Sequence, residues 1–142
     1  MFKKFLKKTP ENTNDKVKIA SLLIHAAKID ENFTDKEKEI ILKIIMNLNK
    51  IPKDKAENIF NEAQKKEQES NQIIEFTKEI KKNSMEYRLK IIEMLWKIVY
   101  SDGTSDIYES NLIRRVCGLL YISDKDSGEI KIKVINSLKR GK

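Results

Sequence analysis

The sequence predicts an all-α fold built on an internal repeat, and three observations lead to this class. Five or more segments carry apolar residues at helical spacing, and none alternates with a sustained period of two. The 142 residues include only 4 Gly and 2 Pro and are 39% hydrophobic, which is typical of a globular chain rich in regular structure. A pattern of apolar and acidic residues also recurs after 72 positions, which indicates two helix-loop-helix units within one core.

The first repeat unit consists of segments 15–29 and 35–49, each with apolar residues on one helical face. Pro52 suits the first turn of a third helix, whose sparse apolar positions predict a peripheral element. The polar stretch KKEQESNQ, residues 65–72, predicts the end of that helix. The core positions expected in the first unit are Val17, Ile19, Ala20, Leu23, Ile24, Ala27, Ile40, Ile41, Ile44, Ile45 and Leu48.

The second half of the chain begins with a short fourth helix, and Ser84 then suits the N-cap of the next one. Segment 85–101 is apolar around most of its circumference, which predicts a central buried helix, and segment 107–121 is its partner. Ser123 caps a last helix, because the alternating EIKIKVI that follows would find no pairing partner as a lone strand. The fourth helix is marked by Ile73, Ile74, Phe76, Thr77 and Ile80.

The charge is distributed in a way that argues against nucleic-acid binding. Of the net charge of +7, residues 1–8 contribute +4 and residues 123–142 contribute +3, whereas residues 9–122 hold 19 charges of each sign. A nucleic-acid interface should place its basic surface on the folded body. We therefore predict a basic N-terminal tail over residues 1–14, a single helical domain over residues 15–138, and no nucleic-acid partner.

The location predicted from the sequence is cytoplasmic. No apolar run approaches the roughly 18 residues of a membrane span, and MFKKFLKKTPENTND has no apolar core of a signal peptide. The one cysteine, Cys117, excludes an internal disulfide and favours a reducing compartment.

The repeat aligns three polar positions in two interhelical loops. Asp30 matches Asp102, and Thr34 followed by Glu37 matches Asp106 followed by Glu109. The last two positions form a capping box, in which Thr or Asp accepts from the N3 amide and Glu reaches back to the N-cap amide. Capping therefore explains two of the three shared positions without a ligand.

Asp30 and Asp102 need a separate explanation, because a carboxylate at a helix C-terminus opposes the helix dipole. A calcium or magnesium ion would offset this cost, with ligands from Asp30, Glu37, Asp102, Asp106 and Glu109. An EF-hand is excluded, because Ile41 or Ile113 stands where the loop needs its final bidentate Glu. Structural capping alone and a divalent-ion site both remain open from the sequence.

Two stretches, LLIHAAKIDENFTDKEKEIILKII and LWKIVYSDGTSDIYESNLIRRVCGLLYIS, resemble the tellurite-resistance TerB family in its small stand-alone branch. The likeness runs from about residue 17 to residue 135. It implies a roughly seven-helix fold with pseudo-two-fold repeats and no catalytic activity, and acidic loops proposed to bind divalent metal. It also implies links to tellurite and stress resistance and to complexes at the inner face of the membrane.

The sequence departs from the TerB pattern just before each acidic loop. Five residues before each loop Asp the family usually has Glu, whereas this chain has His25 and Lys97. A neutral His25 could still coordinate a transition metal, but Lys97 would repel a cation. The first loop also has Glu31 where Gly is usual.

The sequence offers little for catalysis. His25 is the only histidine and is expected to be hydrogen bonded or half exposed, and Cys117 lies at a core position and is expected to be a buried, inert thiol. The chain contains no glycine-rich phosphate loop. We therefore predict a protein that is not an enzyme and requires no cofactor, with a divalent ion as the alternative.

The N-terminal segment MFKKFLKK is amphipathic and defines a candidate contact for a membrane or a partner. Eight residues rarely form a stable helix in water, but each Lys near an anionic lipid surface contributes about 1 kcal/mol. This would place the cytoplasmic protein at the periphery of the inner membrane. The residues proposed for the contact are Phe2, Lys3, Lys4, Phe5, Lys7 and Lys8.

The sequence thus favours a TerB-like binding or scaffold module with protein partners in a stress-related assembly. A calcium-type sensor or buffer that uses the acidic loops is one alternative. A membrane-surface adaptor that uses the basic ends is the other.

Overall fold

The computed structural model describes residues 13–29, 34–69, 73–101 and 107–140. These ranges contain seven helices and no strand, so the all-α prediction is confirmed. The helices are α1 (Thr13–Ala27), α2 (Asp35–Asn49), α3 (Lys53–Glu69), α4 (Ile73–Ile80), α5 (Met85–Val99), α6 (Ile107–Leu119) and α7 (Asp124–Arg140).

Three helices begin where the capping residues in the sequence predict. The Thr34 hydroxyl accepts a hydrogen bond from the Glu37 N–H at 3.2 Å, and Ser84 accepts one from the Tyr87 N–H at 3.2 Å. Ser123 does the same for the Asp126 N–H at 3.1 Å, and the segment that alternates in sequence is helical in α7. These side chains satisfy backbone donors that have no partner within the first turn of a helix.

Helix α3 ends at Glu69, inside the polar stretch 65–72 where the sequence predicts its end, and it includes the first five residues of that stretch. The residues of α3 on its buried face are Ala56, Ile59, Phe60, Ala63 and Glu67. These residues are spaced as on one face of a helix. The last of them is the carboxylate Glu67, and the spacing of apolar residues alone does not identify a charged residue as buried. The small Ala56 and Ala63, both 0% exposed, also let α3 pack closely along α1.

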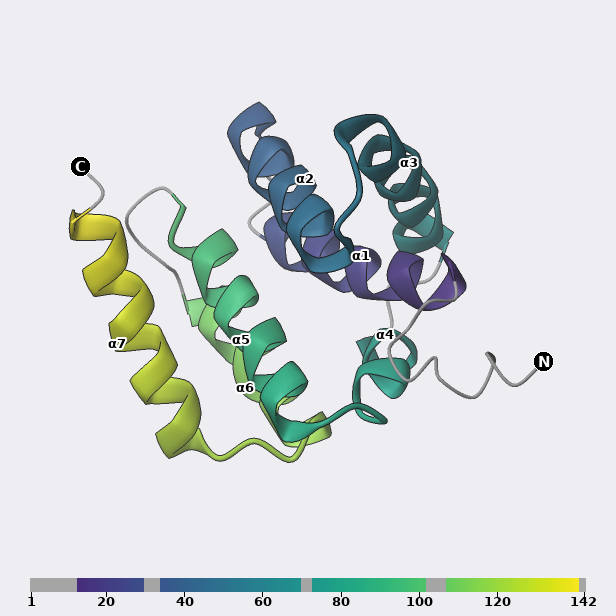
Figure 1. The fold of residues 1–142 in the computed structure, drawn as a ribbon. Coiled ribbons are helices and arrows are strands. Elements are labelled where there is room, and N and C mark those ends of the chain that lie inside the picture. The colour runs from purple at the N-terminus through teal and green to yellow at the C-terminus, as the bar shows by residue number, and fades with distance from the viewer. Residues whose placement is uncertain (1–12, 30–33, 70–72, 102–106, 141–142) are drawn as a thin grey trace.

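The helices form two groups of three, α1–α3 and α5–α7, which Figure 1 shows on opposite sides of the molecule. Helix α4 packs on α1 and contacts α6, and the chain then crosses to α5. Helices α1 and α5 contact each other between the groups. One hydrophobic cluster includes Leu23, Leu95 and Trp96, which are 0%, 0% and 5% exposed. The two groups therefore pack on a shared core.

The helix bounds follow the spacing of the sequence repeat. Helix α1 spans 13–27 and α5 spans 85–99, and α2 and α6 begin at residues 35 and 107. The second helix of each repeat unit, α2 or α6, is followed by a residue in the left-handed region. These residues are Lys50 and Tyr121, with φ values of 54° and 58°. In each case the N–H of the next residue donates a hydrogen bond to a carbonyl in the last turn of the helix. Ile51 N–H donates to Met46 O at 3.1 Å, and Ile122 N–H donates to Cys117 O at 2.9 Å. Superposition of the two units stays a prediction.

A buried polar contact joins the helices of the second group. The indole Nε1 of Trp96 donates to the Ser127 hydroxyl at 3.2 Å. Cys117 is 1% exposed, and burial raises the pKa of its thiol although Ser127 hydrogen bonds to it. A raised pKa keeps the thiol protonated and poorly nucleophilic, so the expectation of a buried cysteine is confirmed.

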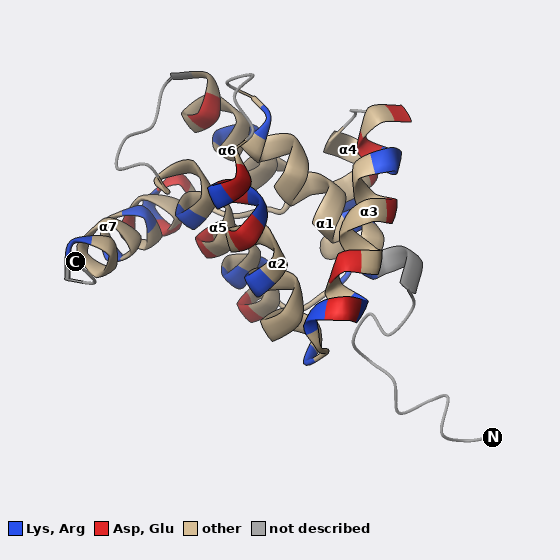
Figure 2. Cartoon of the chain, turned by 90° about the horizontal axis from the view of Figure 1, so that it is seen from above, with Lys and Arg blue, Asp and Glu red and all other residues tan. Residues whose placement is uncertain are grey.

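Charged residues of both signs are interspersed on the described helices, as Figure 2 shows along α2, α5 and α7. None of the described helices is long and apolar enough to cross a membrane.

Candidate functional site

Two of the five predicted metal ligands lie within the described residues, Glu37 and Glu109. They are 8% and 5% exposed, and each lies in the first turn of its helix. Asp30, Asp102 and Asp106 lie outside the described residues. Within the ranges that are described, no group of three or more His, Cys, Asp and Glu residues could hold a metal ion. The divalent-ion site therefore stays a prediction.

The geometry at Glu37 is that of a complete capping box. Its Oε1 accepts from the Thr34 N–H at 2.9 Å, and the Thr34 hydroxyl accepts from the Glu37 N–H. The carboxylate also lies at the positive end of the α2 dipole. Capping therefore accounts for the position and burial of Glu37 without an ion.

Replacing Thr34 with Ala is expected to lower the free energy of unfolding by about 1 kcal/mol, because α2 loses its N-cap acceptor. Thr34→Asn is the control and should change stability little, because Asn caps nearly as well. Thermal unfolding in EDTA and in calcium provides the measurement. If the loop instead holds an ion, calcium will raise the parent melting temperature and Glu37→Gln will abolish that gain.

A buried ionic cluster joins the last turn of α1 to the end of α3. His25 Nδ1 lies 3.0 Å from Glu67 Oε2, and Lys28 Nζ donates to Glu67 Oε1 at 2.8 Å. The Glu67 side chain is 7% exposed. Burial would raise the pKa of this carboxyl, but the hydrogen bonds and charges of Lys28 and His25 outweigh it and hold the pKa below 4.5. Glu67 is therefore ionised at neutral pH.

The sequence predicted that His25 is hydrogen bonded or half exposed, and the structure shows it hydrogen bonded, but the sequence gave no sign of its partner. Glu67 lies 42 residues away, inside the polar stretch 65–72 that was predicted to end the third helix. The available signal was the spacing of Ala56, Phe60, Ala63 and Glu67, which places all four on one face of α3.

A small pocket lies between the end of α1 and the first turns of α6, and we call it the α1–α6 pocket. Its volume is about 260 Å³. His25 is half buried, whereas Tyr108, Asn111 and Arg115 are exposed. The six residues that line the pocket are His25, Ile29, Tyr108, Asn111, Leu112 and Arg115. The pocket therefore brings the two sequence repeats together at one place.

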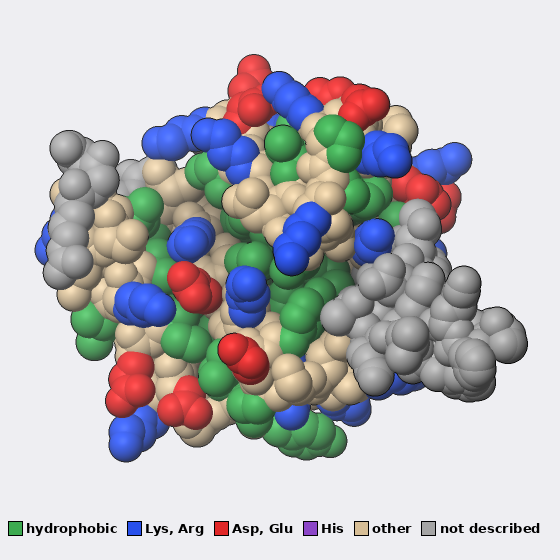
Figure 3. Space-filling model, in the orientation of Figure 1, with side chains coloured by type: hydrophobic (Ala, Val, Ile, Leu, Met, Phe, Trp, Pro, Cys, Tyr) green, Lys and Arg blue, Asp and Glu red, His purple; other side chains and the backbone are tan. Residues whose placement is uncertain are grey.

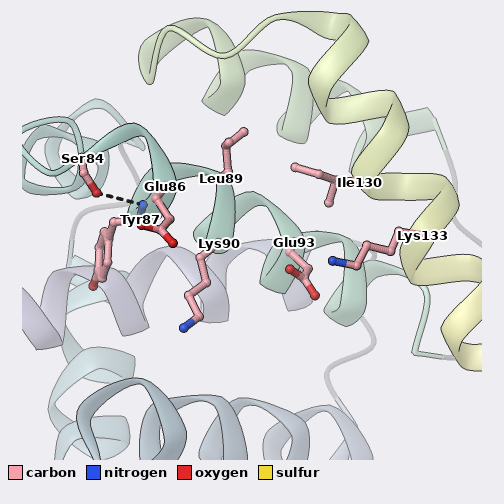
Figure 4. Close-up of a pocket in the computed structure, with 8 residues that line it drawn as sticks. All are labelled: Ser84, Glu86, Tyr87, Leu89, Lys90, Glu93, Ile130 and Lys133. Carbon is pink, nitrogen blue, oxygen red and sulfur yellow. Dashed lines mark hydrogen bonds between the residues drawn. The ribbon is translucent and has the colours of Figure 1, made fainter.

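A larger groove of about 570 Å³ lies between α5 and α7, and we call it the α5–α7 groove. Leu89 and Ile130 face each other across it, and Lys133 extends toward Glu93 (Figure 4). In Figure 3, basic and acidic side chains alternate over hollowed apolar surface in the half of the molecule that holds α5 and α7. The lining residues are Ser84, Glu86, Tyr87, Leu89, Lys90, Glu93, Ile130 and Lys133.

Comparison of the sequence with known protein families shows to which family the chain belongs. The sequence profile described as tellurite resistance protein TerB matches residues 16–132. The chain belongs to the TerB family. No curated protein and no solved structure gave a significant match.

TerB is an all-α family, in agreement with the seven helices of the described residues. It is not a known family of enzymes, and membership supports a domain related to tellurite resistance. The resemblance stated from the sequence is therefore confirmed over nearly the whole chain.

The two residues before the acidic loops that depart from the TerB pattern each contact a glutamate in this chain. His25 hydrogen bonds to Glu67 on another helix, whereas Lys97 forms an ion pair with Glu93 one turn earlier on α5, at 3.6 Å. The predicted contact residues of the N-terminal segment, Phe2, Lys3, Lys4, Phe5, Lys7 and Lys8, lie outside the described residues. Contact of this TerB chain with a membrane stays a prediction.

Proposed function

We propose that this TerB-family chain is a non-catalytic binding module of a stress- or tellurite-resistance-related assembly, and that it holds an amphipathic helix of a protein partner in the α5–α7 groove. The observation that carries this proposal is the combination of apolar and charged side chains in that groove. Helix-in-groove binding is a recurrent mode of peptide recognition, in which an amphipathic helix lays its apolar face on a hydrophobic floor.

The floor of the groove offers apolar contacts. Tyr87, Leu89 and Ile130 pack against the core and remain half buried, so part of their surface is still accessible to solvent. Covering such surface is favourable by about 25 cal/mol per Å² of apolar area removed from water. The groove volume of about 570 Å³ fits a few side chains of a partner better than a whole domain.

The rim of the groove offers charges of both signs. Glu86, Lys90 and Lys133 are exposed, and Glu93 is half buried. Alternating charges at the edge of an apolar surface fix the register of a partner and suppress wrong partners more than they add affinity. We therefore propose a partner helix whose apolar face is flanked by both acidic and basic residues.

Site-directed cross-linking in cells tests this proposal. A photoreactive residue at Lys90, in the groove, is expected to capture one protein through an amphipathic helical segment. The same residue at Lys55, which is exposed on α3, should not capture that protein. Mass spectrometry of the cross-linked peptides identifies the partner segment.

Charge reversal provides the matched control. Lys133→Glu, which changes a groove residue, should reduce the Lys90 cross-link at least about fivefold, because a like charge across an interface is repulsive. Lys125→Glu changes an exposed residue of the same helix outside the groove and should leave the yield unchanged. Equal capture from Lys90 and Lys55, or equal loss in both charge variants, would contradict the proposal.

The same cross-linking with and without calcium separates the scaffold from the sensor. A yield that is independent of calcium favours a constitutive module. A cross-link that requires calcium, and is lost in Asp102→Asn, would favour the sensor predicted as the alternative.

A further inference from the structure

We infer that the α1–α6 pocket binds a small oxyanion, such as a free phosphate or sulfate or the phosphate group of a small metabolite. The lining supplies hydrogen-bond donors from both repeat units: the His25 ring, the Tyr108 hydroxyl, the Asn111 amide and the Arg115 guanidinium. No carboxylate lines the pocket within the described residues. This inference concerns a different surface from the α5–α7 groove and does not depend on it.

Arg115 is the principal charge available to a ligand. It is exposed on α6 and forms no ion pair with another residue in the part of the chain that the structure describes. A guanidinium presents donors in a planar fork that matches two oxygens of a phosphate or sulfate. Asn111 lies one helical turn before Arg115 and adds an amide donor on the same side of α6.

His25, which lines the pocket, is held in place by a contact with Glu67. Its Nδ1 lies 3.0 Å from Glu67 Oε2, and the other oxygen of Glu67 accepts from Lys28. Glu67 does not line the pocket, so Nε2 is the ring nitrogen left for a ligand there. A fixed ring with one nitrogen bonded to a carboxylate is pre-organised to use the other.

The protonation of His25 determines what Nε2 offers. In the neutral ring that donates Nδ1–H to Glu67, Nε2 is an acceptor and would face an anion with its lone pair. In the protonated ring Nε2–H is a donor, and binding an anion favours this state. The charged groups around the ring are Lys28 just after α1, Glu67 on α3 and Arg115 on α6. In either state of the ring, the Arg115 guanidinium lines the pocket as a permanent positive charge.

Calorimetric or NMR titration of the full chain tests the inference, with sodium sulfate as the probe. The parent should bind sulfate saturably. Chemical shifts of residues around the pocket, among them Asn111, should move. Inorganic phosphate and glycerol 3-phosphate, titrated in parallel, distinguish a free ion from a phosphate carried on a small molecule.

Neighbouring arginines provide matched variants. Arg115→Gln should weaken binding at least about tenfold, because it removes the charged fork. Arg114→Gln alters the adjacent exposed residue, which does not line the pocket, and should bind like the parent. His25→Gln should weaken binding less than Arg115→Gln does, because Arg115 still supplies the charged fork.

Three results would overturn the inference. Sulfate binding that is equally weak in the parent, Arg114→Gln and Arg115→Gln would show a non-specific charge effect. Shift changes confined to residues away from the pocket would place the anion elsewhere. Saturable calcium binding that Arg115→Gln strengthens would show that the pocket selects cations.

Discussion

Replacing Leu23 with Ala is expected to lower the free energy of unfolding by about 3 kcal/mol. Leu23 is 0% exposed in the middle of α1, which packs against α2, α3, α4 and α5. Because neighbours on several helices hold the site open, collapse around the smaller side chain is restricted and much of the cavity remains. The melting temperature should fall by roughly 10 °C for a domain of this size.

The matched variant is Leu95→Ala, at the corresponding position of the second repeat and also 0% exposed. If the two helix groups share one core, each variant should lower the stability of the whole chain in a single cooperative transition. Circular dichroism and calorimetry of both variants provide the measurement. Two separate transitions, with each substitution affecting only one of them, would show that the groups unfold independently.

Replacing Glu67 with Gln is expected to lower the free energy of unfolding by about 2 kcal/mol at neutral pH. The substitution keeps the shape of the side chain but removes the charge that stabilises Lys28 and His25. The side chain of Glu67 is 7% exposed and that of His25 19%, so water replaces the lost interactions only in part. Urea unfolding of both proteins measures the difference.

The effect of Glu67→Gln should depend on pH in a defined direction. The folded chain holds the pKa of Glu67 below its ordinary value of 4.5, so the unfolded chain takes up this proton first as the pH falls. The contribution of Glu67 to stability is therefore complete above pH 4.5 and is lost as the pH falls through the folded pKa. The difference in the free energy of unfolding between the parent and Glu67→Gln should become smaller in that acidic range. A difference that stays constant with pH would mean that the carboxylate charge is not what stabilises the cluster.

The helices were largely predictable because apolar spacing and capping residues determine them locally. Segment 35–49 coincides with α2, and Ser84 and Ser123 immediately precede α5 and α7. The sequence was least informative where burial and polarity disagree. Glu67 occupies a core position of α3, but only the fold shows that His25 and Lys28 meet it there.

The candidate surfaces were harder to predict than the helices. The α5–α7 groove and the α1–α6 pocket each combine residues from helices that are not adjacent in the chain. No short sequence motif therefore corresponds to either surface. The repeat nevertheless indicated where to look, because His25 and Ile29 precede the first acidic loop and Tyr108 follows the second. What the sequence could not provide was the packing that brings these ends together.

The single crossing between the helix groups has a consequence for assembly. Residues 81–84 alone connect α4 to α5, and all other contacts between the groups are non-covalent. Two copies can therefore exchange their α5–α7 groups by opening one short hinge, with the contacts of α1 and α2 against α5 and of α4 against α6 rebuilt between chains. Such a domain-swapped dimer would retain the interior of the monomer, and shortening the hinge would favour it, because a strained connection closes poorly within one chain.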